Sequence, residues 1–281
     1  MNNRCASSEL TVAVSVAPHA FLLETIGGDR ISVALLVPAG KEPHEYQPTP
    51  DKVTAFSRSK AFFRTGMQFE ETLLEKLKIL SASQKIVDLR TTIPLRQLEL
   101  HSHEGHNHGE QCNHSDGADP HIWFAPSALK KQVEAIENVL CEIDPDGAEH
   151  YRRNAAALLE DIETTRKKIA EMLSPFKGET FFVFHPSYGY FCDEFELKQS
   201  AVEYEGKSPK PKQLAALIQE AKKVTAEMKR KPLVFVQPEH NMEPAEALAE
   251  AVGGVLLIHS CLEYNVLQSM ERFAEHYAAD R

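Results

Sequence analysis

The chain has 281 residues, of which 42% are hydrophobic and 26% are charged, as in ordinary globular proteins with one large or two modest domains. The formal net charge of −10 argues against a nucleic acid as the partner, because phosphate backbones bind to basic surfaces. No run of residues approaches the roughly 18 apolar residues that a membrane-spanning helix needs.

Short apolar or β-branched runs alternate with longer helical patterns, which predicts an α/β protein with mostly parallel strands. In chain order, the first four predicted strands are Leu10–Val16, Ile31–Val37, Ala61–Arg64 and Lys85–Leu89. Four more predicted strands follow a long helical stretch, at Thr180–Phe184, Lys198–Val202, Leu233–Val236 and Val255–Ile258. The sequence therefore predicts two sets of four strands.

Four helices are predicted between these strands from apolar periodicity and end signals. They cover Pro50–Ser59, Glu70–Leu80, Pro126–Ile143 and the segment from Gly147 to Leu173. The last one stands between the two strand sets and would be about 40 Å long. We therefore predict an N-terminal α/β lobe over residues 10–143, a connecting helix over 147–173 and a C-terminal α/β lobe over 178–281. One continuous eight-stranded sheet is the alternative.

The five cysteines form no CxxC pair, so neither a thiolate zinc cluster nor a redox motif is expected. Cys192 and Cys261 are candidates for a disulfide, which the sequence does not decide. The first ten residues, MNNRCASSEL, lack the apolar core of a signal peptide, so we expect the numbering to begin at a processed or engineered start.

Four histidines stand just past predicted strands or in loops rather than within apolar stripes. They are His44, His121, His185 and His259. Ligands of open α/β sheets gather at the carboxyl ends of the strands, where such loops meet. Glu239 and His240, just past the seventh strand, are weaker candidates, and His19 follows the first strand without being expected to be a ligand.

Several imidazoles in one cleft favour zinc, which binds imidazole nitrogen in tetrahedral geometry at about 2.0–2.1 Å. Calcium and magnesium prefer oxygen ligands. Copper and nickel compete with zinc by raw affinity, so imidazole chemistry alone does not select zinc. Because the imidazoles must be deprotonated, binding is expected to weaken below about pH 6.5.

The chain resembles the metal-specific solute-binding proteins of bacterial ABC importers (cluster A-I type), in particular the zinc-uptake branch. In the first half, the resemblance is carried by IGGDRISVALLVPAGKEPHEYQPTPDKV, DPHIWFAPSALKKQVEAIENVL and YRRNAAALLEDIE. In the second half, it is carried by FVFHPSYGYF, EYEGKSPKPKQLAALI and VFVQPEHNMEPAEALAEAVGG. It runs from about Leu10 to Tyr277 and implies two α/β lobes joined by one long helix, with the metal in the cleft between them.

The resemblance implies metal ligands at His44, His121 and His185. Manganese-selective relatives usually have a carboxylate in place of His185, so the histidine indicates zinc. The fourth position departs from the family, whose members usually have an aspartate followed by Pro-Leu where this chain reads Ile258-His259-Ser260-Cys261. We predict that His259 is the fourth ligand; water or a nearby carboxylate is the alternative.

One histidine-rich tract, HSHEGHNHGEQCNH, covers His101–His114 within a loop over residues 101–118. Its histidines are His101, His103, His106, His108 and His114. The tract resembles the His-rich loop of many zinc-uptake binding proteins, so we expect weak auxiliary zinc binding there; an incidental polar loop is the alternative.

The predicted function is zinc capture for an ABC importer, with Zn²⁺ and a membrane permease as partners, by a periplasmic or extracellular membrane-associated monomer without enzymatic activity. A manganese- or iron-binding homologue and a zinc-dependent hydrolase with an open metal site are the alternatives. No HExxH motif or nucleophile elbow supports the hydrolase. A zinc buffer or adhesin would use the same site, and the sequence does not separate it from an importer component.

Overall fold

The computed structural model describes residues 10–44, 46–81, 83–98, 117–203, 208–226 and 230–279. These residues form two compact units. Unit 1 comprises the described residues up to Pro94, together with Ala128–Glu163 and Leu262–Asn265. Unit 2 comprises the described residues of Leu95–Ser127 and Thr164–Cys261, and those from Val266 onward.

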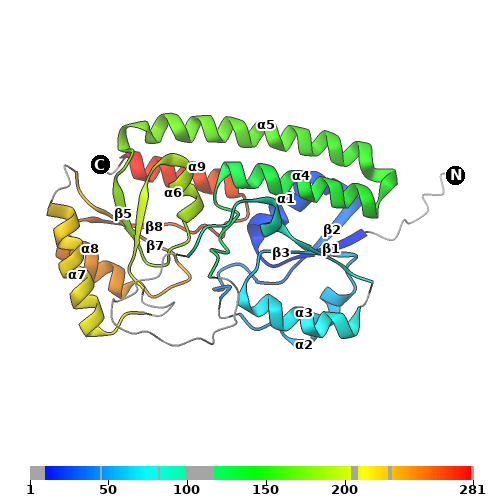
Figure 1. The fold of residues 1–281 in the computed structure, drawn as a ribbon, viewed down its shortest axis with the longest axis horizontal. Helices are drawn as coiled ribbons and strands as arrows, with labels where there is room; N and C mark the ends of the chain where they lie inside the picture. Colours follow the sequence, from blue (N-terminus) through cyan, green and yellow to red (C-terminus); the bar gives the residue numbers. More distant parts are fainter. Residues whose placement is uncertain are drawn as a thin grey trace. The chain divides into compact units, whose positions relative to one another are not determined.

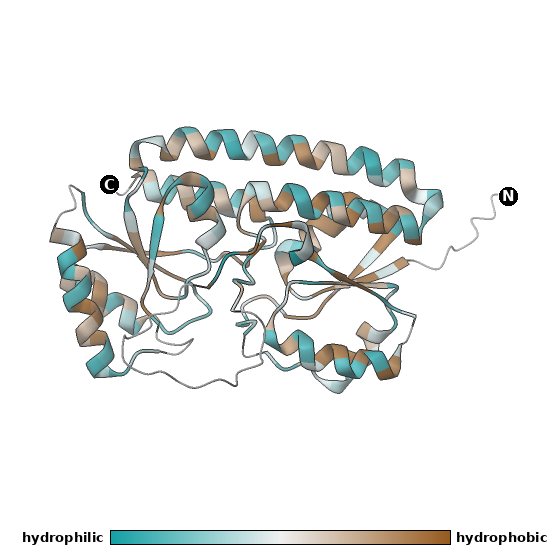
Figure 2. Cartoon of the chain, viewed as in Figure 1, coloured by the Kyte–Doolittle hydropathy of each residue, from teal (hydrophilic) through white to brown (hydrophobic). Residues whose placement is uncertain are grey.

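Unit 1 contains a parallel four-stranded sheet of order β2-β1-β3-β4. Its strands are β1 (Leu10–Val14), β2 (Ile31–Leu35), β3 (Ala61–Arg64) and β4 (Lys85–Asp88). Its helices are α1 (Ala17–Gly27), α2 (Pro50–Ser57), α3 (Gln68–Leu80) and α4 (Pro126–Ile143). Figure 1 shows α2 and α3 on one face of this sheet and α1 and α4 on the other. Because both faces are covered, the central strands β1 and β3 are largely buried and mostly apolar rather than alternating, in keeping with the brown colour of this sheet's centre in Figure 2.

Unit 2 contains a second parallel four-stranded sheet with the equivalent order β6-β5-β7-β8. Its strands are β5 (Thr180–Val183), β6 (Lys198–Ala201), β7 (Leu233–Val236) and β8 (Val255–Ile258). Its helices are α6 (Gly189–Phe195), α7 (Pro211–Ala226), α8 (Glu243–Val252) and α9 (Val266–Ala279). Short 3-10 turns in the chain cover Gly28–Arg30, Leu89–Thr92, Pro145–Gly147 and Ser174–Phe176.

The two faces of the second sheet have different cores. Phe182, Val234 and Val236 point to one face and pack with buried residues of α7 and α8. Phe181 and Phe235 point to the other face, because neighbouring residues of a strand alternate sides. There they pack with Phe273 and Tyr277 of α9, with ring centroids 4.5–6.5 Å apart. The sheet is therefore fixed on both sides, and its carboxyl end is a rigid base for the loops that follow.

The predicted fold class is confirmed: two four-stranded parallel sheets flanked by helices, with one long helix, α5 (Ala148–Leu173), that begins in unit 1 and continues into unit 2 at Thr164. The alternative of one eight-stranded sheet is wrong. The division of the chain differs from the predicted lobes, because Leu95–Ser127 belongs with unit 2 and Leu262–Asn265 with unit 1. Contacts of Leu95–Ser127 with α6, such as Ser127 Oγ to Glu194 at 2.7 Å, explain the first difference.

Helix α1 and the helices α6–α9 were not among the predicted helices. The buried face of helix α1 includes His19, Leu22 and Ile26, but Ala17 and Phe21 on the opposite side are also apolar, so the sequence lacks the one-sided apolar stripe that indicates a helix. Within the described ranges, no helix combines the length and apolar character that crossing a membrane requires.

Candidate metal centre

Two of the predicted ligands, His121 and His185, lie side by side in unit 2. His185 follows β5 at the carboxyl end of the sheet, and His121 belongs to the segment that precedes α4. Their Nε2 atoms are 3.0 Å apart, and their rings meet edge to face with centroids 4.9 Å apart. Their exposed fractions are only 3% and 7%, so few water molecules compete for the two nitrogens.

The ring of His121 is oriented by Asp119, which is fully buried. Asp119 Oδ1 accepts hydrogen bonds from the backbone N–H of His121 at 2.9 Å and contacts its Nδ1 at 2.7 Å. Burial acts to raise the pKa of Asp119, but the charge of His121 and hydrogen bonds from His121 and Arg96 hold that pKa below its usual value. The ionised carboxylate favours a proton on Nδ1 and so turns the lone pair of Nε2 toward His185.

The ring of His185 has a carboxylate on its far side as well. Its Nδ1 lies 2.9 Å from Oε1 of Glu203, which is 4% exposed and follows β6. Among the described residues that oxygen has no aligned hydrogen-bond partner, so the contact is electrostatic. Burial raises the pKa of Glu203 to about 7. Burial also lowers the pKa of His185 well below its usual value, and the nearby charges of His121 and His240 act in the same direction.

The backbone of His185 is fixed by Gln237, the first residue after β7. Its side-chain amide accepts a hydrogen bond from His185 N at 3.2 Å and donates one to His185 O at 2.7 Å. The ring of His240 stacks on that of His185 with a centroid distance of 5.3 Å. The predicted site residues did not include Asp119, Glu203 or Gln237, although each is a buried polar residue next to a strand end or a predicted ligand.

This arrangement favours a cation. If the carboxylates draw the ring protons to both Nδ1 atoms, the two Nε2 lone pairs face each other across 3.0 Å. They repel unless a proton or a metal ion lies between them. A zinc ion bound to both at about 2.0–2.1 Å in tetrahedral geometry would need the nitrogens roughly 3.3 Å apart, so only a small opening is required.

The structure argues against the predicted role of His259 as a ligand. Its Nε2 lies 2.9 Å from the carbonyl oxygen of Ser269, and its Nδ1 lies 3.0 Å from the hydroxyl of Tyr188. The ring packs against Phe124 and Phe273, and burial lowers its pKa to about 4. Both nitrogens are thus engaged in the interior of unit 2, where His259 has a packing role. Glu239, a weaker candidate, accepts a hydrogen bond from Ser260 Oγ at 2.7 Å.

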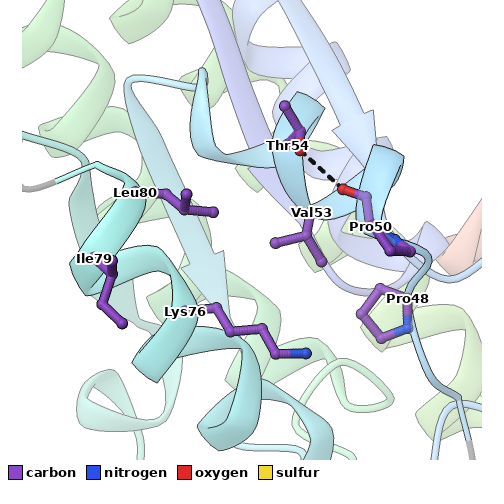
Figure 3. A pocket seen from close by; sticks show the side chains of 7 residues that line it. All are labelled: Pro48, Pro50, Val53, Thr54, Lys76, Ile79 and Leu80. Carbon is purple, nitrogen blue, oxygen red and sulfur yellow. Dashed lines mark hydrogen bonds between the residues drawn. The ribbon is translucent and has the colours of Figure 1, made fainter.

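His44 belongs to unit 1, in the loop between β2 and α2, and it is half-buried. It lines a cavity of about 460 Å³ with Tyr46, Gln68 and Lys76. A neighbouring cavity of about 330 Å³ between α2 and α3 shares Pro48 and Lys76 with it, and Figure 3 shows that apart from Lys76 its walls are mostly apolar. The apolar cavity offers no set of metal ligands, whereas His44 lines the polar one.

The histidine-rich tract, His101–His114, lies outside the described residues. Cys192 and Cys261 are both buried free thiols, so the possible disulfide between them is not formed. His19 is fully buried in unit 1, where its Nε2 lies 2.7 Å from Gln132 Oε1.

The comparisons with known proteins agree on one family. Residues 12–277 match the family described as "Zinc-uptake complex component A periplasmic". The zinc-binding lipoprotein AdcA of Streptococcus pneumoniae (strain ATCC BAA-255 / R6) is 29% identical over 276 residues, which are 98% of this chain and 52% of that protein. The manganese-binding lipoprotein MntA of Halalkalibacterium halodurans (strain ATCC BAA-125 / DSM 18197 / FERM 7344 / JCM 9153 / C-125) is 34% identical over 188 residues, which are 66% of this chain and 58% of that protein.

The fold also matches a crystal structure of ZnuA with a TM-score of 0.84 and 31% identity, covering 97% of this chain and 99% of that one. The chain spans about half the length of the curated relatives it matches. The relatives include zinc-binding and manganese-binding proteins, so they support metal binding more firmly than they support one metal.

Proposed function

The chain belongs to the family of periplasmic zinc-uptake complex components, and on that premise we propose that it captures Zn²⁺ and delivers it to the membrane permease of an ABC importer. The observation that carries the proposal is the His121–His185 pair, whose Nε2 atoms face each other at 3.0 Å with a buried carboxylate behind each ring. Imidazoles backed by carboxylates are a typical zinc-ligand arrangement.

In the proposed site, His44 supplies a third imidazole alongside His121 and His185. Water or a carboxylate fills the fourth place, and Glu203 is the carboxylate that lies beside His185. His259 is left out of the ligand set, because its nitrogens are engaged with Ser269 and Tyr188.

Zinc is proposed over manganese because three neutral imidazoles suit zinc, whereas manganese prefers carboxylate and other oxygen ligands. The protein is proposed to act by binding and release, without catalysis, as a monomer outside the cytoplasm or attached to the membrane surface. Weak zinc binding by His101, His103, His106, His108 and His114 is proposed to supply this site.

Zinc and manganese titrations in competition with a chelator test the proposal. Wild-type protein is expected to bind one zinc ion tightly and manganese weakly, and His44→Ala, His121→Ala and His185→Ala are each expected to lose the tight site. Deletion of residues 101–114 is expected to remove only weaker binding. Equal affinity for manganese at neutral pH, or a tight zinc site that survives His185→Ala, would overturn the assignment. Zinc uptake that depends on both this protein and a permease would separate an importer component from a zinc buffer.

A further inference from the structure

Arg96 lies behind the His121–His185 pair and touches the segments that carry both ligands. Its Nη1 donates to Asp119 Oδ2 at 3.1 Å, while its Nε donates to Asp193 Oδ2 of α6 at 3.0 Å. Only 15% of its side chain is exposed. One guanidinium therefore joins the carboxylate behind His121 to the helix that follows His185.

The backbone around Arg96 is held at the same place. Asp119 N donates to Arg96 O at 2.9 Å, and Gln97 pairs with Ala118 in an antiparallel bridge. The hydroxyl of Tyr190, on α6, donates to Asp119 O at 3.0 Å. Arg96 thus cannot move without moving Asp119, and Asp119 holds both the backbone and the ring of His121.

Gly189 provides the second connection, on the side of His185. It is the first residue of α6 and lies four positions after His185. A methyl group at position 189 would lie 1.5 Å from Arg96 Nη1 and 2.8 Å from Asp119 Oδ2. The guanidinium therefore packs directly on the α6 backbone, and only glycine leaves room for it.

We propose that Arg96 is a positioning residue for the metal site, which fixes the orientation of His121 and its spacing from His185 before metal arrives. The hydrogen bond from Arg96 to Asp119 Oδ2 leaves Oδ1 aimed at His121 Nδ1, and packing on Gly189 sets the distance between the two ligand segments. The inference rests on the proposed function, since it assumes that His121 and His185 bind the metal.

The test compares zinc affinity and the tautomer of His121 in wild-type protein, Arg96→Gln, Arg96→Lys and Gly189→Ala. The tautomer is read in the metal-free protein from ¹⁵N-labelled imidazole resonances. Arg96→Gln and Gly189→Ala are expected to weaken zinc binding about tenfold, at the lower end of the range for residues behind a ligand, and to reduce the fraction of His121 that carries its proton on Nδ1. Arg96→Lys, which keeps a charge for Asp119, is expected to restore part of both properties.

Unit 1 offers a matched control. Arg30 forms an ion pair with Asp144 at 2.8 Å, and a methyl group at Gly147 would lie 2.5 Å from Arg30 Nε. This second Arg–Asp–Gly arrangement touches none of the proposed ligands. Arg30→Gln is therefore expected to lower thermal stability without changing zinc affinity.

The outcomes separate the two hypotheses. If the tight zinc site is lost in His185→Ala but Arg96→Gln keeps wild-type affinity and the wild-type His121 tautomer, the positioning role is refuted and the zinc site stands. If wild-type protein has no zinc site that depends on His185, the proposed function itself is refuted. If Arg96→Gln does not fold, Asp193→Asn provides the measurement, because Asp193 is 60% exposed and its loss removes only the outer contact of the guanidinium.

Discussion

Nε2 of His121 lies 3.0 Å from Nε2 of His185, and the Nδ1 atom of each ring faces a separate carboxylate, Asp119 or Glu203. The four groups come from three segments of unit 2, namely Asp119–His121, the loop after β5 and the loop after β6, so bringing the two rings together depends on the folded sheet. In a protein without metal, the facing nitrogens share one proton or repel. Zinc binding would replace that proton, which links metal capture to proton release.

Asp119→Asn is expected to weaken zinc binding by about 10–100-fold, the typical effect of losing a carboxylate behind a histidine ligand. The asparagine keeps the size of the side chain but loses the charge that favours a proton on Nδ1. Competition titration against a chelator measures the change. Asp88→Asn is the control, because Asp88 forms a comparable ion pair with Arg90 at 2.7 Å in unit 1. An affinity equal to that of wild type in Asp119→Asn would show that the carboxylate has only a structural role.

Glu203→Gln is expected to weaken zinc binding by about tenfold or more, whether the carboxylate orients His185 or occupies the fourth ligand position. X-ray absorption of the zinc-loaded protein distinguishes the two roles. Loss of one oxygen neighbour in Glu203→Gln indicates ligation, whereas an unchanged set of neighbours with weaker binding indicates orientation of the ring. Unchanged affinity would exclude both roles.

His259→Gln is expected to leave zinc affinity within about twofold of wild type, because both nitrogens of His259 are engaged away from the ligand pair. The same variant is expected to lose about 1–3 kcal/mol of unfolding free energy, since it disturbs buried hydrogen bonds to Ser269 and Tyr188. Denaturant unfolding of the metal-free protein measures that loss. Loss of the tight zinc site without loss of stability would restore His259 to the ligand set.

The contrast between His185 and His259 shows which part of the metal site can be predicted from the sequence. Both follow a strand of the same sheet, and the same rule, that ligands gather past the carboxyl ends of strands, selected both. The rule identifies the loop but not the direction of the side chain. The ring of His259 contacts Tyr188 and Ser269, whereas the ring of His185 contacts Glu203 and His240, and no spacing in the sequence reveals these contacts.

The fold was easier to predict than the site, because the positions of strands and helices along the chain follow from local apolar runs. The two four-stranded sheets and the helix α5 were predicted, whereas the assignment of Leu95–Ser127 to unit 2 was not. That assignment depends on side-chain contacts such as Arg96 with Asp193, across 97 positions of the sequence.

Glu70→Gln is expected to destabilise the protein by about 1–3 kcal/mol, because it leaves buried donors facing an amide group. Glu70 is fully buried and accepts hydrogen bonds from the backbone N–H groups of Thr65, Gly66 and Met67 at 2.6–3.2 Å. Urea unfolding measures the loss. The control is Glu71→Gln, whose side chain is 53% exposed and whose ion pair with Arg64 is expected to contribute less than about 1 kcal/mol. Equal losses in the two variants would contradict this account of the loop before α3.

Acid is expected to destabilise the metal-free protein between pH 6.5 and about 4, in part through two of its buried histidines, His19 and His259. Burial lowers the pKa of His19 and of His259 to about 4, against an ordinary value of 6.5. In that interval the unfolded chain binds more protons than the folded one, so stability is complete above pH 6.5 and falls as the pH falls. Each histidine is expected to account for about 3 kcal/mol. Unfolding free energies at several pH values measure the slope, which His19→Phe is expected to reduce. Gln132→Leu removes the hydrogen bond of His19 but keeps its imidazole, so it should retain the dependence of stability on pH. If His19→Phe shows the same dependence on pH as wild type, His19 is not neutral in the folded protein.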